Sequence, residues 1–155
     1  MSKFNSVEKY LDSYRGVKEN IKLAKLEKEG IEALKAQEQA KMSGPGDGMP
    51  RAPGVHDTTY AVCQRAMELY DSQIESNQRL ISELEIRLRQ IEVMITYCGN
   101  EDLINILRRH YCDGVKWEAL AEELHYSNRH VRRLKKAAID NICKRCPLNV
   151  RPMSG

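Results

Sequence analysis

The sequence predicts an all-α fold, in which a long helical hairpin or coiled coil is followed by a small helix-turn-helix domain. Apolar residues recur three and four positions apart over 58–98, a Gly- and Pro-rich segment covers 42–57, and short helical patterns fill 101–146. Aromatic residues make up only 6% of the 155 residues. This low aromatic content suits elongated helices that bury a stripe of side chains.

The first predicted element is a long helix over 5–41, which makes up the N-terminal segment 1–41. This stretch has no Pro and is rich in Glu, Lys, Leu and Ala, all of which favour a helix except where Gly30 weakens it. A heptad-like stripe is expected to face a partner helix. Its members are Val7, Tyr10, Tyr14, Val17, Ile21 and Ala24.

The segment 42–57 is predicted to be a flexible connector. It holds four Gly and three Pro, and these residues disfavour both helix and strand. A phosphate-binding loop is not expected, because the segment lacks a G-K-[ST] ending and no strand precedes it.

The second long helix is predicted over 58–98, with Asp57 or Thr58 as its cap and Gly99-Asn100 at its end. Its apolar seam runs unbroken from Cys63 to Cys98 and contains one polar residue, Asn77, which is expected to fix register or partner number. The helix could fold back on the first one, pair with its copy in another chain, or do both in a four-helix bundle. The residues expected to drive oligomerisation are Met67, Tyr70, Ile74, Asn77, Ile81, Leu84, Leu88, Ile91 and Ile95.

Residues 101–146 predict three shorter helices. The first, 101–111, ends at Cys112-Asp113-Gly114, where Gly supplies the positive φ of a turn. The second, 116–124, is expected to bury Trp117, Leu120, Ala121 and Leu124, with Ala121 as the small residue where two helices cross. A three-residue turn, 125–127, ends at Ser127, which can cap the last helix. That helix is expected to bury Val131, Leu134, Ala138 and Ile142, and Tyr126 is the apolar residue of the turn.

Charge is unevenly distributed along this domain, although the whole chain carries only +3. Residues 126–151 contain eight Arg or Lys and one acid, whereas 101–125 contain three basic and six acidic residues. A basic helix that follows a capped turn fits the major groove of double-stranded DNA, which is about 12 Å wide. The expected DNA-binding residues are Ser127, Asn128, Arg129, His130, Arg132 and Arg133 near the helix start, and Lys135, Lys136, Lys144 and Arg145 farther along.

The stretch from Leu107 to Ile142 resembles region four of bacterial sigma factors. In that family an acidic E-x-x-A helix precedes a short turn and a recognition helix that reads the −35 promoter element. Ala121 and Ser127 match its small and capping positions, and Asn128 to Arg133 match its base- and phosphate-contacting window. The resemblance implies promoter DNA as a partner.

The wider layout resembles phage late-gene transcription activators of the RinA and ArpU kind. These also have a long helical first half, a Met-Pro-Gly-rich connector (here Gly48-Met49-Pro50) and a W-E-x-[IL]-A…Y-S-x-R-x-[VI]-x-R-L block (here Trp117 to Leu134). The resemblance covers roughly 5–145. Sigma region two has no counterpart, so an activator or sigma-like accessory protein is favoured, with host RNA polymerase as a possible contact.

Two other functions remain open from the sequence. A small terminase subunit, the DNA-packaging adaptor of viruses, also combines a helix-turn-helix with long helices, but usually places the DNA-binding part first. A coiled-coil scaffold with a basic tail is the other. An enzyme is not expected, because the four His lie on separate segments and no catalytic spacing recurs.

Cysteine usage and hydropathy suggest a cytoplasmic protein without cofactors. The five Cys are an odd number with no secretion signal before them, so free thiols are expected. Cys143 and Cys146 form a single C-x-x-C pair, and Cys112 is the one further candidate ligand, which falls short of a structural zinc site. No window is apolar enough to span a membrane, and the tail 147–155 is expected to be flexible.

Overall fold

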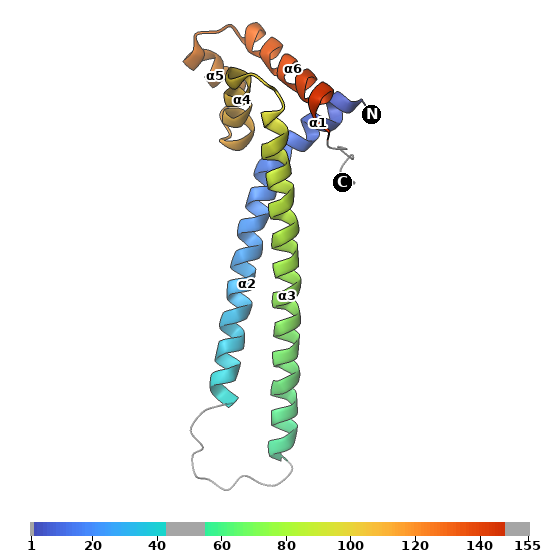
Figure 1. Cartoon of the computed structure of the whole chain (residues 1–155). Coiled ribbons are helices and arrows are strands. Elements are labelled where there is room, and N and C mark those ends of the chain that lie inside the picture. Colours follow the sequence, from blue (N-terminus) through green and yellow to red (C-terminus); the bar gives the residue numbers. More distant parts are fainter. Residues whose placement is uncertain (1, 43–54, 148–155) are drawn as a thin grey trace. The chain divides into compact units, whose positions relative to one another are not determined.

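The computed structural model describes the backbone of residues 2–42 and 55–147, and the side chains of 2–41 and 60–147. Every regular element within these residues is a helix, which confirms the all-α class. Most of the predicted connector and nearly all of the predicted tail lie outside the described residues. In chain order the elements are α1 (Lys3–Asp12), α2 (Tyr14–Met42), α3 (Val55–Thr96), α4 (Glu101–Leu107), η1 (Arg108–Cys112), α5 (Trp117–Leu124) and α6 (Asn128–Arg145) (Figure 1).

The prediction of one helix over 5–41 was wrong at Ser13, which separates α1 from α2. The Ser13 hydroxyl donates a hydrogen bond of 2.6 Å to the carbonyl oxygen of Tyr10. A serine that bonds to the backbone in this way competes with the regular helical ladder and bends the helix. Because α1 is bent away from the axis of α2, α1 can pack against α6.

The predicted end of the second long helix is confirmed. The N–H groups of Tyr97 and Cys98 donate to carbonyls only three residues back, which tightens the final turn. Gly99 then adopts a φ of +75°, which glycine accepts without strain. The Asn100 side chain accepts a 2.9 Å bond from the N–H of Asp102 and so caps α4.

The chain divides into two compact units, which are described separately. One contains Asn20–Glu83, and the other contains Met1–Glu19 together with Leu84–Gly155. In the Asn20–Glu83 unit, α2 and α3 run side by side in opposite directions (Figure 1). Lys28 Nζ donates to Gln78 Oε1 at 2.7 Å, and Lys35 Nζ lies 2.5 Å from Asp71 Oδ1. The pairing within one chain was one of the arrangements that the sequence left open.

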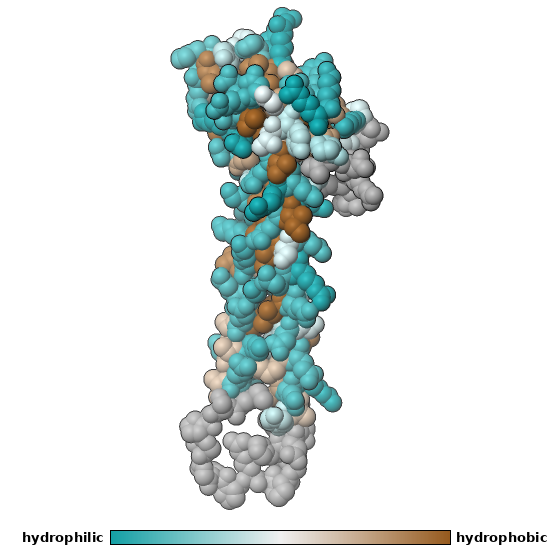
Figure 2. Space-filling view, in the orientation of Figure 1, coloured by the Kyte–Doolittle hydropathy of each residue, from teal (hydrophilic) through white to brown (hydrophobic). Residues whose placement is uncertain are grey.

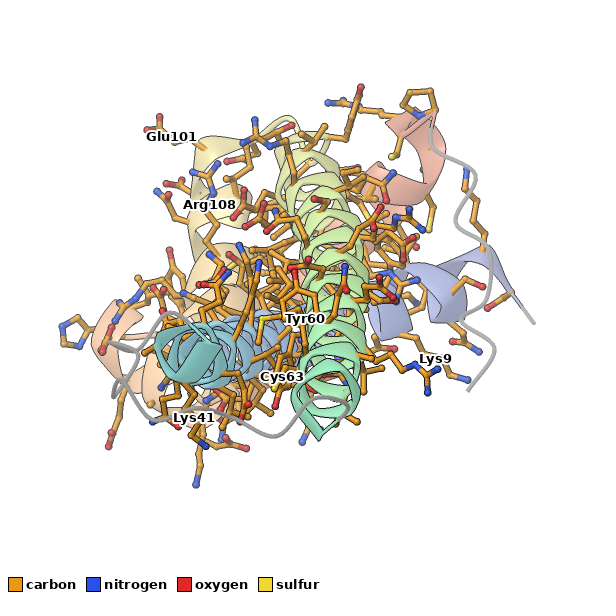
Figure 3. All side chains as sticks on the ribbon, turned by 90° about the horizontal axis from the view of Figure 1, so that it is seen from below. Lys9, Lys41, Tyr60, Cys63, Glu101 and Arg108 are labelled. Atoms are coloured by element: carbon orange, nitrogen blue, oxygen red, sulfur yellow. The ribbon has the colours of Figure 1, made fainter. Side chains whose placement is uncertain are left out.

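The predicted seam of α3 faces α2 in this unit. Figure 3 looks along the paired helices and places Cys63 on the side of α3 toward α2. Ile81 is buried, and the other seam residues up to Leu84 are half-buried. Figure 2 shows hydrophobic side chains still visible along the pair. Since α2 already covers the seam, oligomerisation through these same residues would require α2 to be displaced.

The other unit holds the main hydrophobic core. Its members come from α1, the start of α2, the end of α3, α4, η1 and α6. Tyr10 and Tyr14 point their hydroxyls at α3, donating 2.8 Å bonds to Gln90 and Glu92. The buried core residues are Val7, Leu11, Tyr14, Ile91, Met94, Ile95, Cys98, Leu103, Leu107, Tyr111, Ala138, Ile139, Ile142 and Cys146.

Candidate nucleic-acid interface

The predicted turn between α5 and α6 is present and well defined. Gly114, with a φ of +78°, ends the segment before α5, and His125 adopts the left-handed conformation at the end of α5. The N–H of Tyr126 donates a 2.9 Å bond back to the carbonyl of Ala121. Ser127 Oγ accepts a 3.1 Å bond from the N–H of His130, so Ser127 is the N-cap of α6 as predicted.

The crossing of α5 and α6 depends on small and apolar residues. Ala121 and Leu120 are buried on α5, and Val131 is buried on α6. Two predicted positions were wrong. Leu124 is 37% exposed at the end of α5, and Tyr126 is 44% exposed, with its ring edge-on to His130 at 4.7 Å. Both lie beyond the closest approach of the two helices, where nothing covers them in the described residues.

α6 is buried over a wider face than the sequence indicated. The predicted Ala138 and Ile142 are buried and Leu134 is half-buried, but Ile139 and Cys146 are buried too. α1, α4 and α5 all contact α6, and contact with several helices widens the buried stripe. This packing fixes the direction in which the remaining side chains of α6 point.

The exposed side of α6 carries most of the predicted DNA-binding residues. Arg129, Arg133 and Lys136 follow one another at spacings of four and three, which places them on one face. None of the cations on this side has an ion-pair partner within the residues that the structure describes. The exposed members of the predicted set are Ser127, Asn128, Arg129, His130, Arg132, Arg133, Lys136, Lys144 and Arg145.

Lys135 is held differently from its neighbours. Its ammonium lies 2.6 Å from the Glu8 carboxylate of α1 and 5.5 Å from the centre of the Trp117 ring. The side chain is only 28% exposed. Lys135 therefore joins α1, α5 and α6, and we expect it to be a weaker phosphate ligand than the freely exposed cations.

Arg145 lies beside another segment at the far end of α6. Its guanidinium is next to Gly99, at the turn between α3 and α4, although the side chain stays exposed. Nearby, Asn141 Nδ2 donates a 3.2 Å bond to the carbonyl of Cys98. This bond attaches the C-terminal half of α6 to the end of α3, a proximity that the sequence did not reveal.

A hollow of about 420 Å³ opens beside the exposed face. Its walls come from α1, α5 and α6 and include both aromatic and basic side chains. The hollow brings Phe4 of α1 next to the start of α6, a neighbour that sequence reasoning missed. The lining residues are Phe4, Trp117, Glu118, Asn128, Val131, Arg132, Lys135 and Lys136.

His110 packs against the start of α5. The imidazole stacks on Trp117 at 3.8 Å, and its Nδ1 lies 2.7 Å from the Val115 carbonyl, to which the neutral ring donates. Burial lowers the pKa of His110, although the hydrogen bond to Val115 opposes the change. The ion pair of Arg109 with Glu123 adds a second link between η1 and α5. His110 thus has a packing role here.

The thiols have the character of packed side chains. Cys98 and Cys146 are buried, and the other three Cys are half-buried. Burial raises the pKa of Cys98 to about 11, so this thiol is protonated at neutral pH. No group of three or more potential metal ligands gathers within residues 2–41 and 60–147.

Two further observations concern the chain as a whole. No helix in the described part of the chain is both long and apolar enough to span a membrane. Comparison of the chain with protein-family models, curated proteins and solved structures finds no match.

The left-handed conformation of His125 yields a stability prediction. A non-Gly residue in this region costs on the order of 1–3 kcal/mol, whereas Gly adopts it freely at a smaller cost in unfolded-chain entropy. We expect His125→Gly to raise the free energy of unfolding by about 0.5–1 kcal/mol in urea titrations. The control is Ala119→Gly within α5, which should lower it by about 1 kcal/mol. A His125→Gly protein as destabilised as the control would contradict the turn geometry.

Proposed function

We propose that the protein binds double-stranded DNA in a sequence-specific manner through α6 and regulates transcription. The observation that carries this proposal is the row of exposed cations on α6 that have no ion-pair partner in the described residues. Cations clustered along one face of a helix create a positive potential that attracts a polyanion such as DNA.

The turn before α6 supports the same proposal. Ser127 caps the helix and so stabilises its first turn, in which Asn128, Arg129 and His130 are all exposed. An α-helix is about 10–12 Å across, which matches the width of the major groove. With α6 in the groove, Arg129 and Arg133 would reach base edges, since Arg recognises guanine bidentately. Asn128 would suit adenine.

The phosphate backbone would meet the flanks of the helix. Lys136 and Lys144 are exposed farther along α6, and Arg132 lines the hollow together with Lys136. Contacts to phosphates orient a protein on DNA without reading sequence. Lys135 would contribute less, because Glu8 already pairs with its ammonium.

The regulatory part of the proposal rests on the resemblance of residues 107–142 to sigma factor region four, and of the wider layout to late-gene activators of phages. We accordingly propose a phage or prophage activator whose recognition helix is α6. Promoter or operator DNA would be its partner.

Phosphate contacts give the first test. Each one releases about one counterion, so Lys136→Ala and Lys144→Ala should each lower the slope of log affinity against log salt by about one. Both variants should weaken binding to cognate and random duplexes alike. The measurement is a fluorescence anisotropy titration of the full chain at several salt concentrations.

The matched control for this test is Lys41→Ala. Lys41 is an exposed lysine on α2, which contributes no residue to the exposed face of α6. This variant should keep the slope of the unmodified protein. A chain that binds no duplex even at low salt would refute the proposed function.

A further inference from the structure

The unit formed by Asn20–Glu83 has a second apolar surface besides the seam between its helices. Large aliphatic side chains on both helices are between 44% and 60% exposed. They are Leu23, Leu26 and Leu34 on α2, and Val62, Leu69 and Leu80 on α3. Isolated exposed aliphatics are common on proteins, but a contiguous set marks an interaction surface. These residues form one surface only if they share a face of each helix, lie at matching levels along the two helices, and point to the same side of the pair.

Spacing joins five of these residues into one stripe on each helix, and Leu26 lies on another face of α2. Residues three and four positions apart share one face of a helix. Among the twelve stripe positions only Glu27 is charged, in a chain that is 30% charged. The stripe of α2 is Asn20, Leu23, Glu27, Gly30, Leu34 and Gln37, and that of α3 is Val62, Ala66, Leu69, Gln73, Ser76 and Leu80.

The register of the pair brings the two stripes level. Lys28 meets Gln78 and Lys35 meets Asp71, so seven steps forward on α2 correspond to seven steps back on α3. Continuing this register places Gly30 level with Ser76, and Gln37 level with Leu69. The two stripes therefore occupy the same levels along the shared axis.

The two stripes also lie on one side of the pair. On both helices each stripe residue directly precedes a buried or half-buried residue of the seam, so at about 100° per residue both stripes are rotated from the seam by about 100° in the same sense. Equal rotation on two antiparallel helices leads to the same side. The Lys28–Gln78 contact spans the opposite side, where Gln78 and Asp71 are rotated the other way from the α3 seam. The hairpin thus has one strongly charged side and one side whose stripes carry a single charge, at Glu27.

We propose that this weakly charged face binds the same face of a second copy of the chain, forming a four-helix bundle. A two-fold symmetric interface uses one self-complementary patch on both partners, and a face with few charges meets its own copy with little repulsion. The two helices also complement each other in charge. Within the described side chains of the unit, α2 has five Lys and four Glu, whereas α3 has two Arg and four acids.

This charge difference favours an arrangement in which α2 of one copy lies against α3 of the other. Gly30 supports a close approach at the centre of the face. A Cβ added there would meet no atom within 4 Å, so the surface around Gly30 is open. The five exposed aliphatic residues of the face would then lose contact with water, which favours association.

The test is light scattering of the full chain after size exclusion, over a range of loading concentrations. We expect a mass twice the 17.8 kDa of one chain. The double variant Leu69→Lys with Leu80→Lys should shift to the mass of one chain. Both side chains are already exposed, at 58% and 44%, so the variant should keep its helical circular dichroism.

The matched control is Ile86→Lys. Ile86 lies on α3, is 60% exposed, and lies about 120° around the helix from Leu80. This variant should remain a dimer. Three results would overturn the proposal: a single-chain mass for the unmodified protein at every concentration, a dimer that survives the double variant, or a dimer that Ile86→Lys disrupts equally. DNA binding by a single-chain protein would leave the proposed function intact.

Discussion

Replacing Ile139 by Ala is expected to lower the free energy of unfolding by about 2–5 kcal/mol, the usual cost of deleting a large aliphatic side chain from a packed core. Ile139 is completely buried on α6, in one hydrophobic cluster with Val7 of α1 and Ile95 of α3. The substitution would remove packing contacts from the hydrophobic cluster that holds α6 in place. Urea unfolding followed by circular dichroism measures it.

Ile86→Ala is the control for this stability prediction. The same substitution at a position that is 60% exposed should change the free energy of unfolding by no more than about 0.5 kcal/mol. A loss below about 1 kcal/mol for Ile139→Ala would mean that α1 and α3 do not enclose this side of α6 in solution.

Replacing Arg129 or Arg133 by Ala is expected to remove about 1–3 kcal/mol of binding to the cognate duplex, which is roughly a ten- to hundredfold loss of affinity. Both arginines are exposed on the first two turns of α6, where a groove-reading helix contacts base edges. Binding to random duplexes should change little. The measurement is a titration of each variant on both duplexes at matched salt.

Lys144→Ala is the comparison in that experiment, because a phosphate contact carries no sequence information. It should weaken both duplexes to the same extent. Equal losses on both duplexes for Arg129→Ala and Arg133→Ala would show that another face of α6 enters the groove.

Local chemistry made much of this fold predictable. The cap at Ser127, the positive φ of Gly114 and the stop at Gly99 all depend on residues within a few positions of one another. The seam of α3 was also readable, since three-four spacing persists from Cys63 to Cys98. What the seam would pack against was left open, because a stripe does not identify its partner.

The features that the sequence did not reveal are contacts between distant segments. The break at Ser13 depends on one hydroxyl bond, and serine is tolerated in many helices. Docking of α1 on α6 then buries Ile139 and draws Lys135 to Glu8. Nothing in the basic run distinguishes Lys135 from Lys136. The one available signal was the acidic pair Glu8 and Asp12, four residues apart on α1.

In the candidate site too, some features follow from the local sequence and others from contacts between distant segments. The exposed positions of Asn128, Arg129, Arg132 and Arg133 follow from the apolar stripe of their own helix, so the sequence was sufficient to predict them. The proximity of Arg145 to Gly99 joins the last helix to the turn after α3. Such a contact could be found only once the helices were placed in space.

Selection of duplexes from a random pool by the full chain tests the central claim most directly. The unmodified protein should enrich a common sequence motif, because base contacts discriminate by about 1–3 kcal/mol per position. The double variant Arg129→Ala with Arg133→Ala should still retain duplexes at low salt but enrich no motif. Failure of the unmodified protein to retain any duplex at low salt, or enrichment of the same motif by the double variant, would contradict DNA recognition through α6.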